Sequence, residues 1–171
     1  MTSLIELKDI KYSYGILKNS FCLGPISLVL PNNKLVFWVG KNGSGKSTLA
    51  KIINGEIKQF EGNLMKDKIS VVYYKQAISE NIFTELSIRQ HIKLLNDKTN
   101  RQKESYKKLI PDFNSILDKY PDELSGGQLQ LFGFCMLLFK KYDLYIFDEI
   151  TNHLDELNLR NVLKYIKYTL I

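Results

Sequence analysis

Residues 40–47 have the types and the spacing needed to bind a polyphosphate. They read Gly-Lys-Asn-Gly-Ser-Gly-Lys-Ser, the pattern of a phosphate loop, also called Walker A. Lys46 is expected to reach the β- and γ-phosphates, Ser47 to offer its hydroxyl to Mg²⁺, and Thr48 to bond the α-phosphate. The alternative is a chance glycine-rich turn. The apolar segment before the loop and the helical pattern after it favour a nucleotide site instead.

Two adjacent carboxylates, Asp148 and Glu149, follow the apolar run Leu144–Phe147. At the carboxyl edge of an open parallel sheet, such a pair is expected beside the phosphate loop. One carboxylate, Asp148, would hold Mg²⁺, and the next, Glu149, would polarise the attacking water or take its proton. The alternative is a strand that simply ends in a polar turn, which the phosphate loop in the same chain disfavours.

A third group, Ser125–Gln128, reads Ser-Gly-Gly-Gln and precedes another apolar run. Ser125 with Gln128 three residues later is a capping box, so a helix is expected to begin here. A helix N-terminus with exposed glycine N–H groups also binds anions. A second phosphate site in one chain is explained if two copies pair and each closes this segment on the other's nucleotide.

An α/β core is needed to position these groups. Strand patterns alternate with helical ones, which indicates a parallel sheet. The expected strands are 4–10, 26–30, Leu35–Val39, Ile69–Tyr74 and Leu144–Phe147, and the expected helices are 48–53, which stops near Gly55, and 159–170. Residues 77–124 have helical periodicity that Pro111 and Pro121 interrupt, and they are expected to form a helical insertion.

Composition limits the function classes. The 171 residues suffice for one domain with its own core. No apolar run approaches the roughly 20 residues of a membrane-spanning helix, and no signal peptide is expected, so a membrane role would need a partner. The net charge of +6 comes mostly from scattered lysines, which makes nucleic acid an unlikely partner. Cys22 and Cys135 are expected to be buried thiols.

The order of Walker A, Leu-Ser-Gly-Gly-Gln and the paired carboxylates (Walker B) resembles the ATPase domain of the ATP-binding cassette (ABC) superfamily, over nearly the whole chain. Weaker matches fall where that family has them. Tyr14 resembles the aromatic residue that stacks on adenine, with Tyr12 as the second choice. Gln76 resembles the Q-loop glutamine that senses Mg²⁺ and the attacking water. Residues 152–155 resemble the D-loop, whose aspartate lies at the dimer interface.

This resemblance implies a fold, a reaction and partners. The fold is the P-loop NTPase (RecA-like) type, an α/β parallel-sheet core with an N-terminal β subdomain and an inserted helical subdomain. The reaction is hydrolysis of ATP with Mg²⁺, coupled to transport. The implied partners are separate membrane-spanning subunits, which would hold the chain at the cytoplasmic face of the membrane, and a second ABC ATPase domain that pairs with this one on binding ATP.

The resemblance also assigns roles to particular residues. The implied catalytic residues are Glu149, Lys46 and Gln76, and the implied Mg²⁺ ligands are Ser47, Gln76 and Asp148. The implied nucleotide contacts are Tyr14, Gly40, Asn42, Gly43, Ser44, Gly45, Lys46, Ser47, Thr48, Ser125, Gly126, Gly127 and Gln128.

One feature of the family has no counterpart in the sequence. The family carries a switch histidine well beyond the Walker B glutamate, and too few residues follow Glu149 to include it. His153 falls in the D-loop and His91 in the helical insertion, so neither takes that role. We therefore expect one ABC domain over residues 1–171 without the switch-histidine region. Two other functions stay open: a non-transport ABC protein acting on ribosomes or nucleic acid, and an ATP-binding remnant with little hydrolysis.

Overall fold

The computed structural model divides the chain into two compact units. It describes residues 3–15, 21–66, 68–74, 82–94, 106–138, 141–148 and 154–170. The first unit comprises Met1–Tyr73, Tyr142–Ile146 and Ile171, and the second comprises Tyr74–Lys141 and Phe147–Leu170. Each unit has its own cluster of buried apolar side chains.

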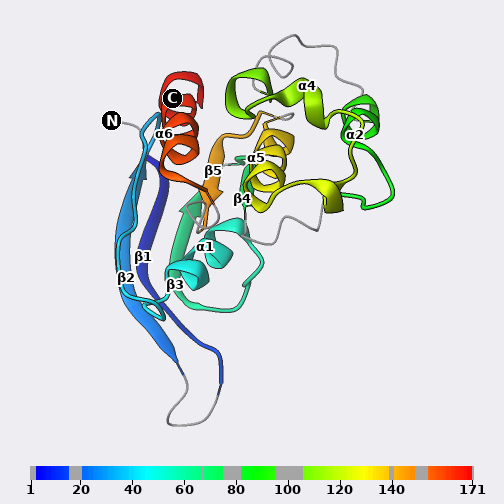
Figure 1. Cartoon of the computed structure of the whole chain (residues 1–171). Helices are drawn as coiled ribbons and strands as arrows, with labels where there is room; N and C mark the ends of the chain where they lie inside the picture. Colours follow the sequence, from blue (N-terminus) through cyan, green and yellow to red (C-terminus); the bar gives the residue numbers. More distant parts are fainter. Residues whose placement is uncertain are drawn as a thin grey trace. The chain divides into compact units, whose positions relative to one another are not determined.

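An antiparallel sheet of three strands opens the first unit (Figure 1). In it, β1 (Ser3–Ser13) lies between β2 (Cys22–Pro31) and β3 (Glu61–Lys66). Successive side chains of a strand face opposite sides, so Ile5 and Leu7 of β1 are buried while Lys8 is exposed. The strands predicted at 4–10 and 26–30 are confirmed, whereas β3 was not predicted.

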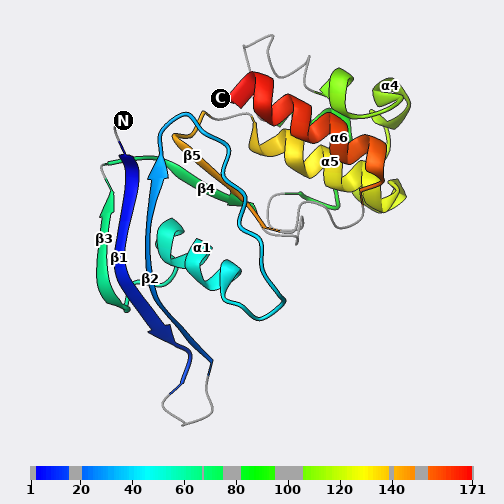
Figure 2. The same cartoon turned by 90° about the vertical axis from the view of Figure 1, so that its left-hand side faces the viewer.

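Helix α1 (Lys46–Asn54) packs against this sheet, as Figure 2 shows. Ile52 and Ile53 are buried in the cluster that contains the inward side chains of β1. The helix ends where the sequence predicts, because Gly55 adopts a left-handed conformation (φ 85°) and its N–H bonds the carbonyls of Lys51 and Ile52.

Two further strands, β4 (Val71–Tyr74) and β5 (Leu144–Phe147), pair with each other. The Leu144 N–H donates to the Ser70 carbonyl at 3.1 Å, and the Asp148 N–H donates to the Tyr74 carbonyl at 2.9 Å. Both partners advance in the same direction, so the pairing is parallel. The predicted strands are confirmed here, with β4 shorter than expected. The last residue of each strand belongs to the second unit.

The strand predicted for Leu35–Val39 is wrong, because residues 34–41 form no regular secondary structure. Phe37 is 65% exposed and Val39 is 95% exposed, and only Trp38 of this run packs against the cluster of the first unit. An apolar run becomes a strand only when a neighbouring strand accepts its backbone hydrogen bonds. Among the described residues, no strand pairs with this segment.

The second unit is mainly helical (Figure 1). Its described elements include α2 (Ile88–Leu94), α4 (Phe113–Ile116), the 3₁₀ turn η2 (Pro121–Glu123), α5 (Gly126–Leu137), α6 (Glu156–Tyr165) and the π-helical turn η3 (Ile166–Leu170), and residues 106–109 are helical as well. Pro111 lies between helical segments and Pro121 begins η2, so both interrupt the helical pattern as predicted, since proline cannot continue a preceding helix. The predicted final helix is confirmed by α6 and η3.

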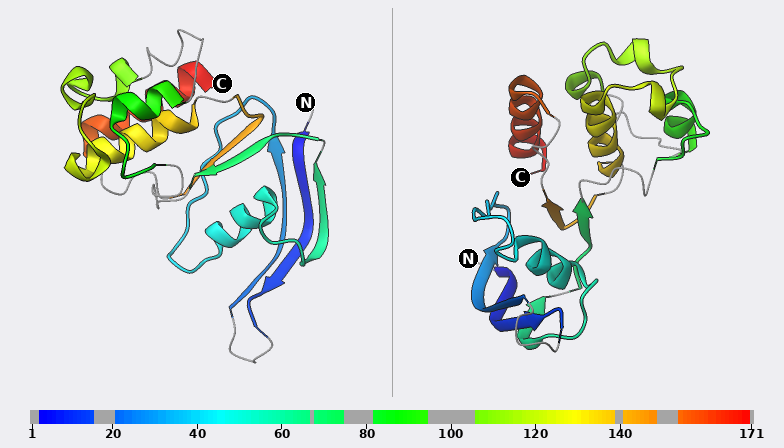
Figure 3. Two further views of the ribbon diagram at one scale, coloured as in Figure 1. Left: turned by 90° about the vertical axis from the view of Figure 1, so that its right-hand side faces the viewer. Right: turned by 60° about the horizontal axis from the view of Figure 1, so that its bottom comes forward.

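Aromatic side chains dominate the core of the second unit. Tyr106 stacks on Phe113 with 5.1 Å between ring centroids and lies against Phe132 of α5. Val162 of α6 and Ile166 of η3, four residues apart, add one buried face of the C-terminal helical segment to the same cluster. Figure 3 shows the helices of this unit from two further sides.

The two thiols differ. Cys135 is buried in α5, as predicted, and burial raises the pKa of its thiol far above the ordinary value. Cys22 is exposed at the start of β2, so its predicted burial is wrong. In the part of the chain that the structure describes, no helix has the length and apolar character required to cross a membrane.

Candidate nucleotide-binding site

The phosphate loop leaves the N-terminus of α1 without a side-chain cap. Gly45 is the N-cap residue, with φ 95°, and as a glycine it offers no side chain to accept a hydrogen bond from the first turn. No acidic side chain lies in that turn either. The first N–H groups of a helix have no partner within it and carry partial positive charge. This helix end therefore suits an anion such as a phosphate group.

Lys46 spans the loop that precedes its own helix. Its Nζ donates to the Gly40 carbonyl at 2.8 Å and to the Lys41 carbonyl at 3.0 Å, and it lies 3.5 Å from the Ser44 hydroxyl. These contacts are exposed, so phosphate oxygens could replace the carbonyls as acceptors at little desolvation cost. The loop itself is closed by a turn in which the Ser44 N–H bonds the Lys41 carbonyl at 3.1 Å.

Tyr14 approaches the same helix from the end of β1. Its hydroxyl lies 3.2 Å from Oγ1 of Thr48, and the residue is 54% exposed. The Tyr12 ring meets it edge-on at 4.9 Å and packs partly into the hydrophobic cluster. The structure thus brings Tyr14, rather than Tyr12, to a predicted phosphate-binding residue. An exposed ring at this place is free to stack on a planar base.

The Ser125–Gln128 segment forms the predicted capping box at the start of α5. The Ser125 hydroxyl accepts from the Gln128 N–H at 3.2 Å, and the Ser125 N–H donates to Oε1 of Gln128 at 3.1 Å. Ser125 and Gly126 are exposed, and a Cβ added at Gly126 would meet no atom within 4 Å. The turn therefore presents an open backbone surface at a helix N-terminus, the arrangement predicted for a second anion site.

The carboxylates are only partly described. Asp148 directly follows β5 and is held there by the bond from its N–H to the Tyr74 carbonyl. Glu149, Gln76 and residues 152–153 of the predicted D-loop lie outside the described residues. Asp155 caps α6, a role that was not predicted for it: Oδ1 accepts from the Asn158 N–H at 2.7 Å. Asp followed three residues later by Asn was the signal for this cap.

The site residues divide between the two units. The first unit brings Tyr14, residues 40–45 and the start of α1 together. The second unit holds the Ser125–Gln128 segment and Asp148.

Replacing Gly45 with Ala is expected to lower the free energy of unfolding by about 1–3 kcal/mol, because a non-glycine residue is strained at φ 95°. The added Cβ would also clash with Cδ1 of Leu23. Gly43→Ala is the matched control: its φ is 77°, but no atom lies within 4 Å of the added Cβ. Urea denaturation should show a larger loss for Gly45→Ala, and equal losses would contradict this account of the loop.

A family model for ABC transporters matches residues 23–152. The chain is 31% identical to an energy-coupling factor transporter ATP-binding protein of Mycoplasma mobile, covering 97% of this chain and 66% of that protein. It is 33% identical to a zinc import ATP-binding protein of Wigglesworthia glossinidia brevipalpis, covering 95% and 68% respectively. The chain thus spans about two thirds of the length of these relatives.

Solved structures show the same fold. A dimeric, post-hydrolysis state of an ATP-binding cassette bound to ADP and Pi matches 96% of this chain and 83% of its own, with a TM-score of 0.76 and 21% identity. The motifs, the fold and the family match agree. The chain belongs to the ABC transporter family, and its fold is that of the family's P-loop ATP-binding domain.

Proposed function

We propose that the chain is the ATP-binding and ATP-hydrolysing subunit of an ABC transporter, which energises transport through separate membrane-spanning subunits. The observation that carries this proposal is the uncapped N-terminus of α1 with Lys46 spanning the loop before it. Relatives named as zinc import and energy-coupling factor transporter proteins support a transport role over one on ribosomes. Held by such partners, the chain would lie at the cytoplasmic face of the membrane.

The two units would act as one ABC domain, with residues 77–124 as its helical insertion. Lys46 and the loop amides would hold the phosphates, and Tyr14 would leave Thr48 to stack on adenine when Thr48 bonds the α-phosphate. Ser47, Asp148 and Gln76 offer hydroxyl, carboxylate and amide oxygens, which are ligands that Mg²⁺ accepts. When bound, Mg²⁺ would neutralise charge on the phosphates. Glu149 would take the proton of the attacking water.

The complete site would need two copies. Ser125 and Gly126 are exposed at the N-terminus of a twelve-residue helix, where the backbone N–H groups of the first turn lie. In the proposed pair, Ser125 and Gly127 of one copy contact the γ-phosphate held by Walker A of the other. The dimeric form of the structural relative supports such pairing.

Release of phosphate from Mg-ATP at increasing protein concentration tests this proposal. A site shared by two copies predicts a specific activity per chain that rises with protein concentration until all chains pair. A specific activity that stays constant over the whole range would support a site within one copy. ATP binding without any release would support the remnant instead.

A further inference from the structure

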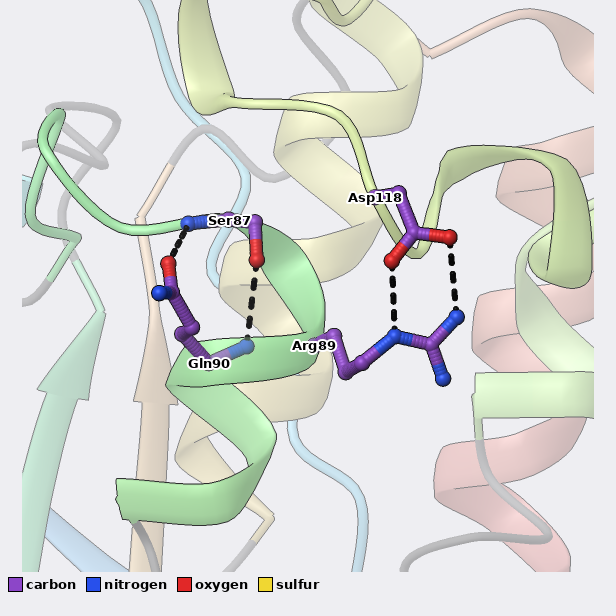
Figure 4. Close-up of polar contacts among 4 residues, drawn as sticks. All are labelled: Ser87, Arg89, Gln90 and Asp118. Carbon is purple, nitrogen blue, oxygen red and sulfur yellow. Dashed lines mark hydrogen bonds and ion pairs between the residues drawn. The ribbon is translucent and has the colours of Figure 1, made fainter.

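Arg89 and Asp118 form a two-point ion pair in the helical unit (Figure 4). Nε of Arg89 donates to Oδ1 of Asp118 at 2.7 Å, and Nη2 donates to Oδ2 at 2.9 Å. The planar guanidinium matches the carboxylate, so this pair fixes orientation as well as distance. The hydrogen bond from Arg89 lowers the pKa of the Asp118 carboxyl below its ordinary value.

Backbone bonds join the same two segments. The Ile88 N–H donates to the Lys119 carbonyl at 3.0 Å, and the Arg89 N–H donates to the Leu117 carbonyl at 2.7 Å. These are first-turn groups of α2, which have no acceptor inside their own helix. The same end of α2 is also closed by the Ser87–Gln90 capping box, drawn in Figure 4. The start of α2 is thus held against residues 117–119.

The chain between residue 119 and the start of α5 is short and constrained at each step. Glu123 closes the η2 turn, because its Oε2 accepts from the Tyr120 N–H at 2.7 Å. Pro121 is buried within that turn, and the Leu124 N–H bonds its carbonyl at 3.3 Å. The Ser125 capping box follows directly. A displacement of Asp118 would therefore also displace the Ser125–Gln128 segment.

A second contact joins α2 to α5 away from this end. The His91 ring of α2 is buried and meets the Phe132 ring of α5 edge-on at 5.6 Å. The ring is itself fixed, since Nε2 accepts from the Phe83 N–H at 2.9 Å. Helix α2 is thus held at two places. His91 contacts α5 in the core, and Arg89 contacts Asp118 in the segment that leads to α5.

We propose that Arg89 and Asp118 are positioning residues for the Ser125–Gln128 segment, and that ATP-driven pairing of two copies depends on their ion pair. This inference rests on the proposed function, in which that segment closes on the nucleotide of a second copy. Neither residue touches the nucleotide. The pair sets the direction in which the N–H groups at the start of α5 point, so its loss weakens pairing and leaves ATP binding by Walker A intact.

The pair is suited to a test because the fold does not depend on it. The two side chains are 46% and 79% exposed, and the backbone bonds and the buried contacts of α2 remain when either side chain is shortened. Arg160 offers a matched control. It forms an equally short ion pair with Glu156, 2.6 Å long, but both residues lie within α6. Arg160→Gln thus removes an exposed arginine ion pair and leaves the pair between Arg89 and Asp118 in place.

Sedimentation velocity with increasing Mg-ATP, in a Glu149→Gln background that halts hydrolysis, measures pairing directly. We expect Arg89→Gln to raise the ATP concentration for half-maximal pairing about three- to tenfold. Binding of a fluorescent ATP analogue to single chains should stay unchanged, as should both measurements for Arg160→Gln. The exchanged pair Arg89→Asp with Asp118→Arg should restore pairing.

Pairing of Arg89→Gln at the parental ATP concentration would overturn the inference. The inference would also fail if the exchanged variant, shown to be folded by thermal unfolding, did not regain pairing. If the Glu149→Gln background itself never pairs with ATP while binding the analogue, the proposed two-copy function fails, and the inference fails with it. The two failures are therefore distinguished by the background chain alone.

Discussion

Phosphate release by a Glu149→Gln chain is expected to fall about 100- to 1,000-fold, because a general base contributes a factor of this order. Glutamine keeps the size and the hydrogen-bonding reach of the side chain, but its amide cannot take the proton of the attacking water. ATP binding should be unaffected, since the proposed phosphate contacts come from Walker A. The variant should therefore stay paired around unhydrolysed ATP. Phosphate release and sedimentation with Mg-ATP measure the two effects.

Glu156→Gln is the control for this change. Glu156 is an exposed carboxylate whose ion pair with Arg160 lies within α6, so its loss should leave turnover at the parental rate. A Glu149→Gln chain that hydrolysed ATP as fast as its parent would remove Glu149 from the mechanism. If parent and variant were equally slow while both bound ATP, the chain would be a binding remnant.

Replacing Lys46 with Ala is expected to weaken ATP binding about 10- to 100-fold, since hydrogen bonds to charged groups contribute about 1.5–3 kcal/mol each. The ammonium group is the one cation that the structure places across the phosphate loop, in its described residues. Titration with a fluorescent ATP analogue measures the loss, and thermal unfolding shows whether the variant is folded.

Lys51→Ala removes the same charge from the same helix, one and a half turns further on, in the last turn of α1. It should leave the affinity for ATP near the parental value, because the macrodipole and the loop amides at the other end of α1 are untouched. Equal losses for Lys46→Ala and Lys51→Ala would show that ATP responds to overall charge and that Walker A is not its site.

The parts of the fold that could be predicted from sequence have local causes. Gly55 ends α1 because glycine adopts the left-handed conformation there, and Ser125 begins α5 because its hydroxyl reaches the Gln128 N–H. The phosphate loop was recognised for a similar reason. Its glycines and the helix after it are consecutive in the chain, so their geometry follows from the spacing alone.

The parts that were missed depend on distant partners. Leu35–Val39 has the composition of a buried strand, yet burial needs a neighbouring strand, which no periodicity within the run reveals. β3 is the opposite case, a strand that the sequence did not predict. Its residues have little preference for strands, but pairing with β1 imposes one, and Gly62 (φ 94°) allows close approach to the carbonyls of Lys8 and Asp9.

The same limit applies to the candidate site. Its motifs could be read from the sequence, but the contact between Tyr14 and Thr48 joins residues from separate elements and needed the structure. The ion pair between Arg89 and Asp118 joins positions 29 residues apart, and it also needed the structure. The roles of Glu149 and Gln76 stay predictions, because both residues lie outside the described part of the chain.

Mixing two inactive variants tests the central claim, that each ATP site is shared between two copies, most directly. Lys46→Ala disables Walker A. Gly126→Asp disables the Ser125–Gln128 segment, because the added carboxylate would repel the phosphate. The variant should still fold, since the position has room for a side chain and an acidic residue suits the first turn of a helix.

In a mixed pair, one of the two sites combines an intact Walker A with an intact Ser125–Gln128 segment. The account predicts that two preparations, each nearly inactive alone, regain roughly a quarter of the unmodified phosphate release per chain when mixed in equal amounts, if pairs form at random. Release from the mixture that merely equals the mean of the two separate variants would contradict it.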